Sequence, residues 1–103
     1  MSKIPTIVTL CGSTKFKDAF IDANKRETLA GNIVLSVGFF GHADNLKMDD
    51  YTKKMVDEIH KRKIDLSDEI LVLNVGGYIG ASTKSEILYA LKSKKTVRYL
   101  EAQ

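Results

Sequence analysis

Short apolar segments alternate along this chain with longer amphipathic ones. The short segments are rich in β-branched residues and are bounded by glycine, proline or polar residues, a pattern typical of strands buried in a sheet. We expect four strands, at residues 7–10, 33–37, 70–73 and 96–100. The longer segments repeat their apolar residues every three or four positions, which predicts three helices, at residues 15–30, 50–66 and 83–93.

The alternation of strands and helices predicts an α/β fold with a parallel sheet, because a helix is the usual connection between parallel strands. We expect a small three-layer sandwich of the Rossmann or flavodoxin-like type, with a four-stranded parallel sheet in the order 2-1-3-4. The chain of 103 residues is long enough for one domain, and we assign residues 1–103 to it. In this order the first and third strands are neighbours, and parallel sheets bind ligands at the carboxyl edge of such a pair.

The same periodicity predicts which side of each helix faces the sheet. Asp49 or Asp50 can cap the second helix. The buried side of that helix should carry Tyr51, Met55 and Ile59. The sheet-facing residues of the other two helices are expected to be Phe16, Ala19, Phe20, Ala23, Ala30, Ile87, Leu88, Ala90 and Leu91.

Composition and charge narrow the class of protein. Hydrophobic residues make up 44% of the chain and charged residues 28%, as in ordinary globular proteins. No apolar run approaches the roughly 20 residues that span a bilayer, and the N-terminus is a poor signal peptide. We therefore expect a cytoplasmic protein that does not bind a membrane. The net charge of +3 suits small anionic ligands, whereas nucleic acid is not an expected partner because no motif for it is present.

Two glycine-containing turns follow the first and third strands, at the edge where a ligand is expected. The first turn contains Cys11, Gly12 and Ser13, and the second contains Gly77 and Gly80. Glycine permits positive φ angles and a close approach of a ligand to the backbone. Hydroxyl and free N–H groups at helix starts bind phosphate, but the same residues can simply cap the helices. The candidate phosphate ligands are Ser13, Thr14, Lys15, Ser82, Thr83 and Lys84.

Glu86 is the strongest candidate for chemistry, and the sequence allows two interpretations of it. As a functional group it is a nucleophile or base at the floor of the pocket, because a helix N-terminus favours an ionised carboxylate and carboxylates can attack anomeric carbons. As a structural group it completes a capping box, since Thr83 precedes it by three positions.

The loop at residues 38–45 carries two aromatic residues and a histidine past the end of the second strand. Phe40 and His42 are candidates for binding a base, and His42 could donate a proton. Alternatively, Phe39 and Phe40 complete the core or a subunit interface.

Cys11 and the second histidine, His60, are each open to a functional or a structural interpretation. Cys11 ends the first strand, where a buried inert thiol is the commoner role. His60 faces the pocket if the second helix approaches the third strand, and otherwise it is a half-buried packing residue. His42 and Asp44 are too few ligands for a metal site, and the sequence shows no other cluster of His and Cys. We therefore expect neither a metal nor a cofactor.

Three short motifs occur in a characteristic order. They are the first turn at residues 10–13, the aspartate and apolar strand at residues 67–73, and the glutamate-containing helix and Lys-x-Val segment at residues 85–97. In this order and spacing they resemble the nucleoside 2-deoxyribosyltransferase-like superfamily, which includes the 2′-deoxynucleoside 5′-phosphate N-hydrolases. The resemblance covers nearly the whole chain.

The resemblance implies that Glu86 attacks C1′ of a deoxyribose and displaces the base, and that Ser13 and Ser82 meet a 5′-phosphate or 5′-hydroxyl. It also implies a homodimer, because such enzymes often complete the site with a residue of a second subunit. At three positions where the superfamily has tyrosine, aspartate and glycine, the chain has Thr9, His60 and Leu88. A histidine could still donate a proton to the leaving base.

From the sequence we therefore expect cleavage or transfer at the N-glycosidic bond of a nucleoside or nucleoside 5′-monophosphate, with Glu86 as nucleophile and His60 as its catalytic partner. One alternative is a nucleotide-binding module of the same fold that does not turn over its ligand. Another is an interaction protein in which the turns are only well-capped connections.

Overall fold

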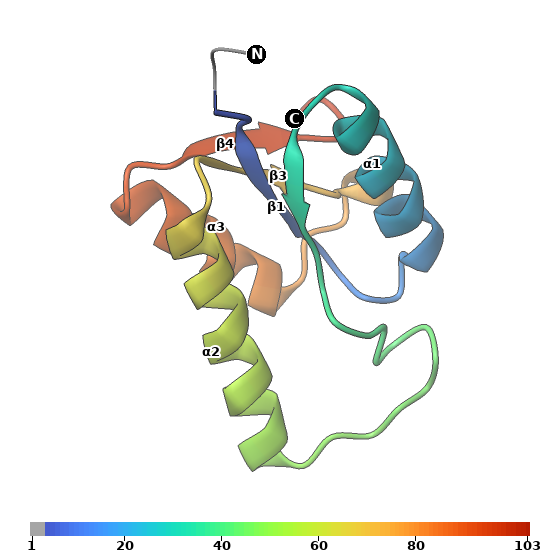
Figure 1. The fold of residues 1–103 in the computed structure, drawn as a ribbon. Coiled ribbons are helices and arrows are strands. Elements are labelled where there is room, and N and C mark those ends of the chain that lie inside the picture. The colour runs from blue at the N-terminus through green and yellow to red at the C-terminus, as the bar shows by residue number, and fades with distance from the viewer. Residues whose placement is uncertain (1–3) are drawn as a thin grey trace.

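Four parallel strands form the central sheet, in the order β2-β1-β3-β4 (Figure 1). They are β1 (Ile7–Cys11), β2 (Ile33–Leu35), β3 (Glu69–Val72) and β4 (Thr96–Tyr99). This computed structural model describes residues 4–103, and it confirms the predicted fold class and strand order. β1 and β3 end together, because Cys11 is paired with Val72 in the register of the two strands.

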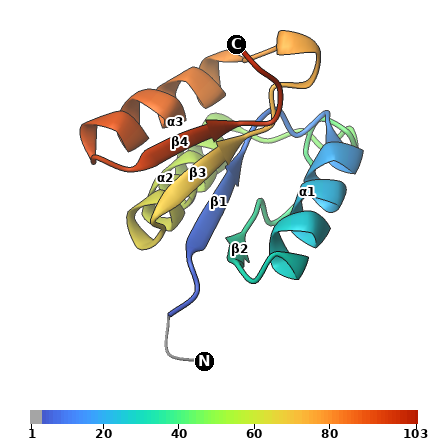
Figure 2. The ribbon, with the colours of Figure 1, turned by 90° about the horizontal axis from the view of Figure 1, so that it is seen from above.

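The helices form the two outer layers. α1 (Lys17–Leu29) covers one face of the sheet, and α2 (Asp50–Leu66) and α3 (Ala81–Lys92) cover the other (Figure 2). A short 3₁₀ turn, Val75–Gly77, follows β3 and leads towards α3. Among residues 4–103 there is no helix with both the length and the apolar character that a membrane span requires.

Two apolar clusters hold these layers together, one on each face of the sheet. Consecutive strand residues point to opposite faces. Leu10 therefore belongs to the cluster that contains Phe20 of α1, whereas Ile70 belongs to the cluster that contains Ile64 of α2. β1 and β3 are covered on both faces, which explains why nearly all of their residues are buried.

Local hydrogen bonds determine where the first two helices begin. Asp49 caps α2, as predicted, since its Oδ1 accepts a hydrogen bond from the Thr52 N–H at 2.7 Å. α1 begins at Lys17 rather than at residue 15. The residues before it form a turn in which the Phe16 N–H donates to the Ser13 carbonyl at 3.0 Å.

The buried side of α2 differs from the prediction. Tyr51, Met55 and Ile59 are 78%, 46% and 48% exposed, and His60 and Ile64 are buried instead. The first half of α2, with Tyr51 and Met55, extends beyond the sheet edge, while the C-terminal half lies against the sheet (Figure 1). Ile59 is in the half that packs on the sheet, but it is rotated by about 100° around the helix axis from the buried His60. Tyr51, Met55 and Ile59 therefore form an exposed apolar stripe, called here the α2 stripe.

In α3, half of the prediction is confirmed. Ile87 and Ala90 are buried against the sheet as expected, but Leu88 and Leu91 are more than half exposed. Adjacent residues on a helix are rotated by about 100° around its axis. A helix that rests on the sheet along one narrow side therefore buries only one residue of each adjacent pair.

Arg98 of β4 joins three elements. Its Nη2 donates to Glu27 Oε1 of α1 at 2.6 Å, and its Nε donates to Glu69 Oε1 of β3 at 2.7 Å. The hydrogen bond from Arg98 is the main reason why the pKa of Glu27 lies below its ordinary value, and a hydrogen bond from Asn32 acts in the same direction. These contacts fasten the edge strand β4 to the rest of the sandwich.

We predict that Arg98→Met lowers the free energy of unfolding by about 1–3 kcal/mol, because it leaves the Glu27 carboxylate without its strongest partner. The depressed pKa of Glu27 contributes stability above the ordinary pKa of 4.5, and that contribution is lost as the pH falls through the pKa of the folded state. The difference between the two proteins should therefore shrink in acid. Urea denaturation at neutral and acidic pH measures it.

The control for this experiment is Arg26→Gln, which breaks an exposed pair with Asp22 on α1. An exposed pair of this kind contributes less than about 1 kcal/mol. Equal losses of stability in the two variants would contradict a structural role for the Arg98 contacts.

Candidate functional site

A cavity of about 430 Å³ opens at the carboxyl edge of β1 and β3. The turn after β1, one side of α2 and the start of α3 form its walls. A smaller, mostly apolar pocket of about 170 Å³ adjoins it, and the two share wall residues such as Thr14 and Val56. The larger cavity has the size of an ordinary small-molecule site. The structure therefore places a hollow at the edge where the sequence predicted a ligand.

Glu86 lines this cavity and does not cap its own helix. α3 begins after Gly80, so Thr83 is the third residue inside the helix and cannot serve as its N-cap. Thr83 is also 3% exposed, and α3 has no side-chain capping hydrogen bond. The capping-box interpretation of Glu86 is therefore wrong, and its carboxylate belongs to the cavity wall.

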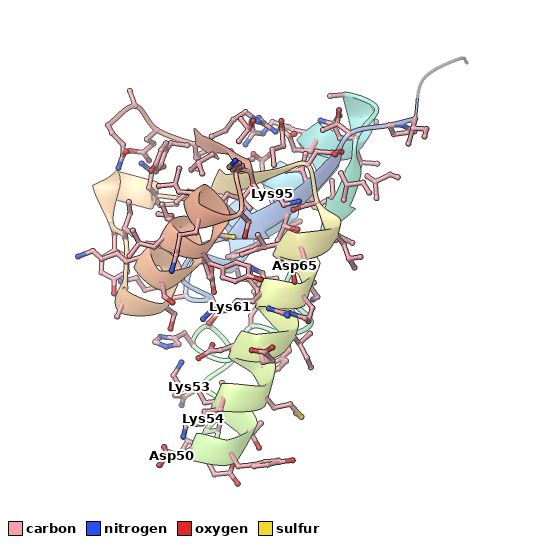
Figure 3. The ribbon with its side chains drawn as sticks, turned by 90° about the vertical axis from the view of Figure 1, so that its left-hand side faces the viewer. Asp50, Lys53, Lys54, Lys61, Asp65 and Lys95 are labelled. Atoms are coloured by element: carbon pink, nitrogen blue, oxygen red, sulfur yellow. The ribbon has the colours of Figure 1, made fainter. Side chains whose placement is uncertain are left out.

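Burial controls the ionisation of Glu86. It raises the pKa of the carboxyl to about 7, and the negative charge of Asp57 acts in the same direction. A hydrogen bond from the Cys11 thiol and the charges of Lys53 and Lys61 act against this rise. Figure 3 shows both lysines projecting from α2. Near pH 7 the carboxyl is therefore divided between its neutral and ionised forms.

His60 reaches the cavity from α2, which is the placement that the functional interpretation required. Its Nε2 lies 3.8 Å from Glu86 Oε1 and 3.5 Å from Cys11 Sγ. Burial, together with the nearby charge of Lys63, lowers the pKa of His60 to about 4, although a hydrogen bond with the Leu10 backbone partly opposes the shift. The imidazole is therefore neutral at pH 7.

Cys11 is fully buried at the end of β1, as the structural interpretation expected. Burial and the adjacent Glu86 carboxylate raise the pKa of its thiol well above the ordinary value. The sulfur, the His60 ring and the Glu86 carboxylate each offer an atom within 4.8 Å of the others. The sequence-based view that no such cluster exists is wrong, because these residues come from β1, α2 and α3.

The start of α3 has features that would suit an anion. Gly80 precedes the helix without a capping side chain, and Ala81, Ser82 and Thr83 follow it along the cavity wall. The first N–H groups of a helix have no partner within the helix and carry partial positive charge. Lys53 adds a full charge, with its Nζ 3.4 Å from Ser82 Oγ. This corner of the cavity therefore suits phosphate or another small anion.

The turn after β1 contributes Gly12 and Ser13 to the wall, as predicted. A Cβ atom on Gly12 would lie 3.2 Å from the Leu73 Cβ and carbonyl oxygen, so glycine permits the close approach of this turn to the chain after β3. His42 also lines the cavity, and its backbone N–H donates to Thr14 Oγ1 at 3.1 Å. That hydrogen bond joins the loop after β2 to the first turn.

Five predicted binding residues do not line the cavity wall formed by the described part of the chain: Cys11, Lys15, Phe40, Gly77 and Lys84. Lys15 places its ammonium group 3.7 Å from the centre of the Tyr78 ring. Phe40 packs against Phe20 in the core, with ring centres 5.6 Å apart, which agrees with its structural interpretation. Gly77 belongs to the 3₁₀ turn, where its φ of 81° favours glycine.

Several wall residues were not singled out from the sequence, notably Lys53 and Asp57. Lys53, Asp57 and His60 follow one another on α2 at intervals of four and three residues, so their side chains share one side of the helix. That spacing was visible in the sequence and could have identified them. Thr9, which stands where the resemblance expects tyrosine, is fully buried and donates to the Lys63 carbonyl at 3.1 Å.

Comparison of the chain with known proteins found no match among family models, curated proteins or solved structures. The resemblance to the nucleoside 2-deoxyribosyltransferase-like superfamily therefore depends on the sequence motifs alone.

We predict that the side-chain carboxyl of Glu86 titrates near pH 7, which NMR of the protein with carbon-13-labelled glutamate would measure. Asp57→Asn should lower this pKa, because it removes a negative charge that disfavours ionisation of Glu86. Glu58→Gln is the matched control, since Glu58 is the next residue but pairs with Arg62 on the exposed side of α2. A Glu86 pKa at the ordinary value would contradict the burial described here.

Proposed function

We propose that this protein cleaves or transfers at the N-glycosidic bond of a nucleoside or nucleoside 5′-monophosphate, with Glu86 as nucleophile. The observation that carries the proposal is the placement of the Glu86 carboxylate in the wall of a cavity that it shares with Gly12 and Ser13. The ionised carboxylate attacks C1′ of the sugar and forms a C–O bond. The C1′–N bond breaks, and the base leaves with its electron pair; water or a second base then releases the sugar.

The two ends of the cavity suit the two ends of a nucleotide. The uncapped start of α3, with Ser82 and Lys53 beside it, can hold a 5′-phosphate. The adjoining pocket is apolar, and Phe39, Met48 and Val56 line it. A flat nucleobase would bury apolar surface there, which supports a nucleoside as the ligand.

The charge states favour separate roles for the two candidate catalytic residues. With a pKa of about 7, Glu86 has a substantial ionised population at neutral pH, and this population grows as the pH rises. With a pKa of about 4, His60 carries no charge at neutral pH and is a poor source of an imidazolium proton. We therefore propose that His60 positions Glu86, which lies 3.8 Å away.

We predict that Glu86→Gln lowers the rate of base release by about 10³-fold or more, because the amide cannot act as the nucleophile. The measurement is chromatography of free base after incubation with a panel of nucleosides and 5′-monophosphates. Glu58→Gln on the exposed side of α2 is the control and should keep the parent rate. If Glu86→Gln remains folded by circular dichroism and retains the parent activity, the nucleophile assignment is wrong.

A nucleotide-binding module without turnover is the second candidate. The burial of Thr9 away from the cavity favours it, because no group at this position can orient the Glu86 carboxylate. The same panel separates the two functions. A nucleoside monophosphate at 100 times its Kd should stabilise the fold by about 2.7 kcal/mol, measured by thermal unfolding, in either case. Stabilisation without any released base would select the binding module.

We also propose that two copies of the chain associate through the α2 stripe. Tyr51, Met55 and Ile59 expose apolar side chains at four-residue spacing, so they form one continuous surface along the helix. Ile59 also lines the apolar pocket beside the cavity. A second copy docked on the stripe would therefore lie next to the proposed binding site.

We predict that Ile59→Lys shifts the protein from dimer to monomer, because it places a charge within the apolar surface that the dimer would bury. Sedimentation equilibrium measures the change. Leu29→Lys is the matched control, since Leu29 is also an exposed apolar residue but lies at the end of α1 on the other face of the sheet. A parent protein that is monomeric at high concentration would refute the proposed dimer.

A further inference from the structure

Cys11, His60 and Glu86 place three different donor atoms around one point. The Cys11 Sγ to His60 Nε2 distance is 3.5 Å, the His60 Nε2 to Glu86 Oε1 distance is 3.8 Å, and all three donors lie within 4.8 Å of one another. Zinc binds sulfur at about 2.3 Å and nitrogen or oxygen at about 2.0–2.2 Å. In a tetrahedral site these bond lengths separate sulfur from nitrogen by about 3.5 Å and nitrogen from oxygen by about 3.4 Å. Two of the three separations therefore match such a site, and the third, between Cys11 Sγ and the Glu86 carboxylate, lies within 4.8 Å against about 3.6 Å in a tetrahedral site.

The surroundings of the cluster also suit a cation. Glu86 is largely buried, yet no lysine or arginine among residues 4–103 forms an ion pair with it. Lys53 instead pairs with Asp57 at 3.4 Å, and Lys63 donates to the Ser36 carbonyl at 2.6 Å. A buried carboxylate without a cationic partner is costly. A metal ion would supply the missing charge at this point.

The histidine presents one ring nitrogen to the cluster. His60 Nε2 faces Cys11 Sγ and Glu86 Oε1, and the residue is only 7% exposed, so the packing around the ring fixes its position. His60 and Glu86 also line the cavity, so a fourth position would be open to water or a ligand.

We propose that Cys11, His60 and Glu86 form a three-ligand site for Zn²⁺ or a similar borderline-soft divalent cation, with its fourth position open to the cavity. On binding, the S–H bond of Cys11 breaks and its proton leaves to solvent, while the sulfur, imidazole nitrogen and carboxylate oxygen each donate an electron pair to the metal. The mixed sulfur, nitrogen and oxygen set selects zinc-like ions over magnesium or calcium, which prefer oxygen ligands alone.

This metal site depends on the cluster and not on glycosidic cleavage. It has one consequence for the proposed function, because a carboxylate that binds metal is withdrawn from attack on C1′. If base release is found, Zn²⁺ should inhibit it. If base release is absent, the metal site is still tested by spectroscopy, so the failure of one proposal is distinguishable from the failure of the other.

The test is a titration of the chelator-treated protein with Co²⁺, a spectroscopic substitute for Zn²⁺. Cys11 is the only cysteine of the chain, so a thiolate-to-cobalt charge-transfer band in the near ultraviolet can arise from no other residue. We expect this band, together with intense visible bands of tetrahedral cobalt, to saturate at one Co²⁺ per chain and to disappear on addition of Zn²⁺. Binding without the thiolate band, or no binding at all, would overturn the proposal.

Variants assign the other two ligands. Cys11→Ser should abolish the charge-transfer band, and His60→Gln and Glu86→Gln should each weaken Co²⁺ binding by about 10-fold or more. The control is His42→Gln, which removes the only other histidine and should leave the spectrum unchanged. Loss of the band in His42→Gln, or its survival in both His60→Gln and Glu86→Gln, would refute the assignment. The spectrum of the parent protein decides the presence of the site even if a variant does not fold.

Discussion

The parallel pairing of β1 with β3 is the constraint on which the candidate site depends. It aligns Cys11 with Val72, so both strands end at the same edge of the sheet. The turn after β1 then approaches the chain after β3 so closely that a Cβ atom on Gly12 would lie only 3.2 Å from Leu73. α3 begins near this edge and places Glu86 in the wall of the cavity. Loss of this pairing would separate the two turns and remove the cavity between them.

Burial at this edge has opposite effects on its two titratable groups. It raises the pKa of Glu86 to about 7 and lowers the pKa of His60 to about 4, because a low-dielectric environment disfavours charge on either one. The neutral pair is therefore favoured over an ion pair at 3.8 Å. A carboxyl with a pKa of about 7 is partly ionised at neutral pH, and its ionised form can attack a carbon atom or bind a cation. The two proposals concern competing uses of the same carboxylate.

α2 combines two roles because its two halves have different surroundings. The C-terminal half packs against the sheet through Ile64 and brings His60 to Cys11. The first half extends beyond the sheet, where Asp57 and Lys53 line the cavity and Tyr51 remains exposed. A helix that only covered the sheet would have no free length to form a cavity wall. The projection of α2 therefore creates both the site and the exposed α2 stripe beside it.

The sequence by itself determined the α/β fold and the cap at the start of α2, because these depend on local periodicity and on short-range hydrogen bonds. The strand order was predicted from the usual topology of alternating strands and helices, in which crossover connections are right-handed. The sequence also identified Glu86 and His60 as candidates. Only the tertiary structure decided between capping and exposure to a cavity for Glu86, since that choice depends on where α3 begins. It also decided which side of α2 is buried, because periodicity defines a face of a helix but not how much of the helix overlaps the sheet. The contact of Cys11 with residues of α2 and α3 could not be predicted for the same reason: distances between residues far apart in the chain are set by the packing of whole elements.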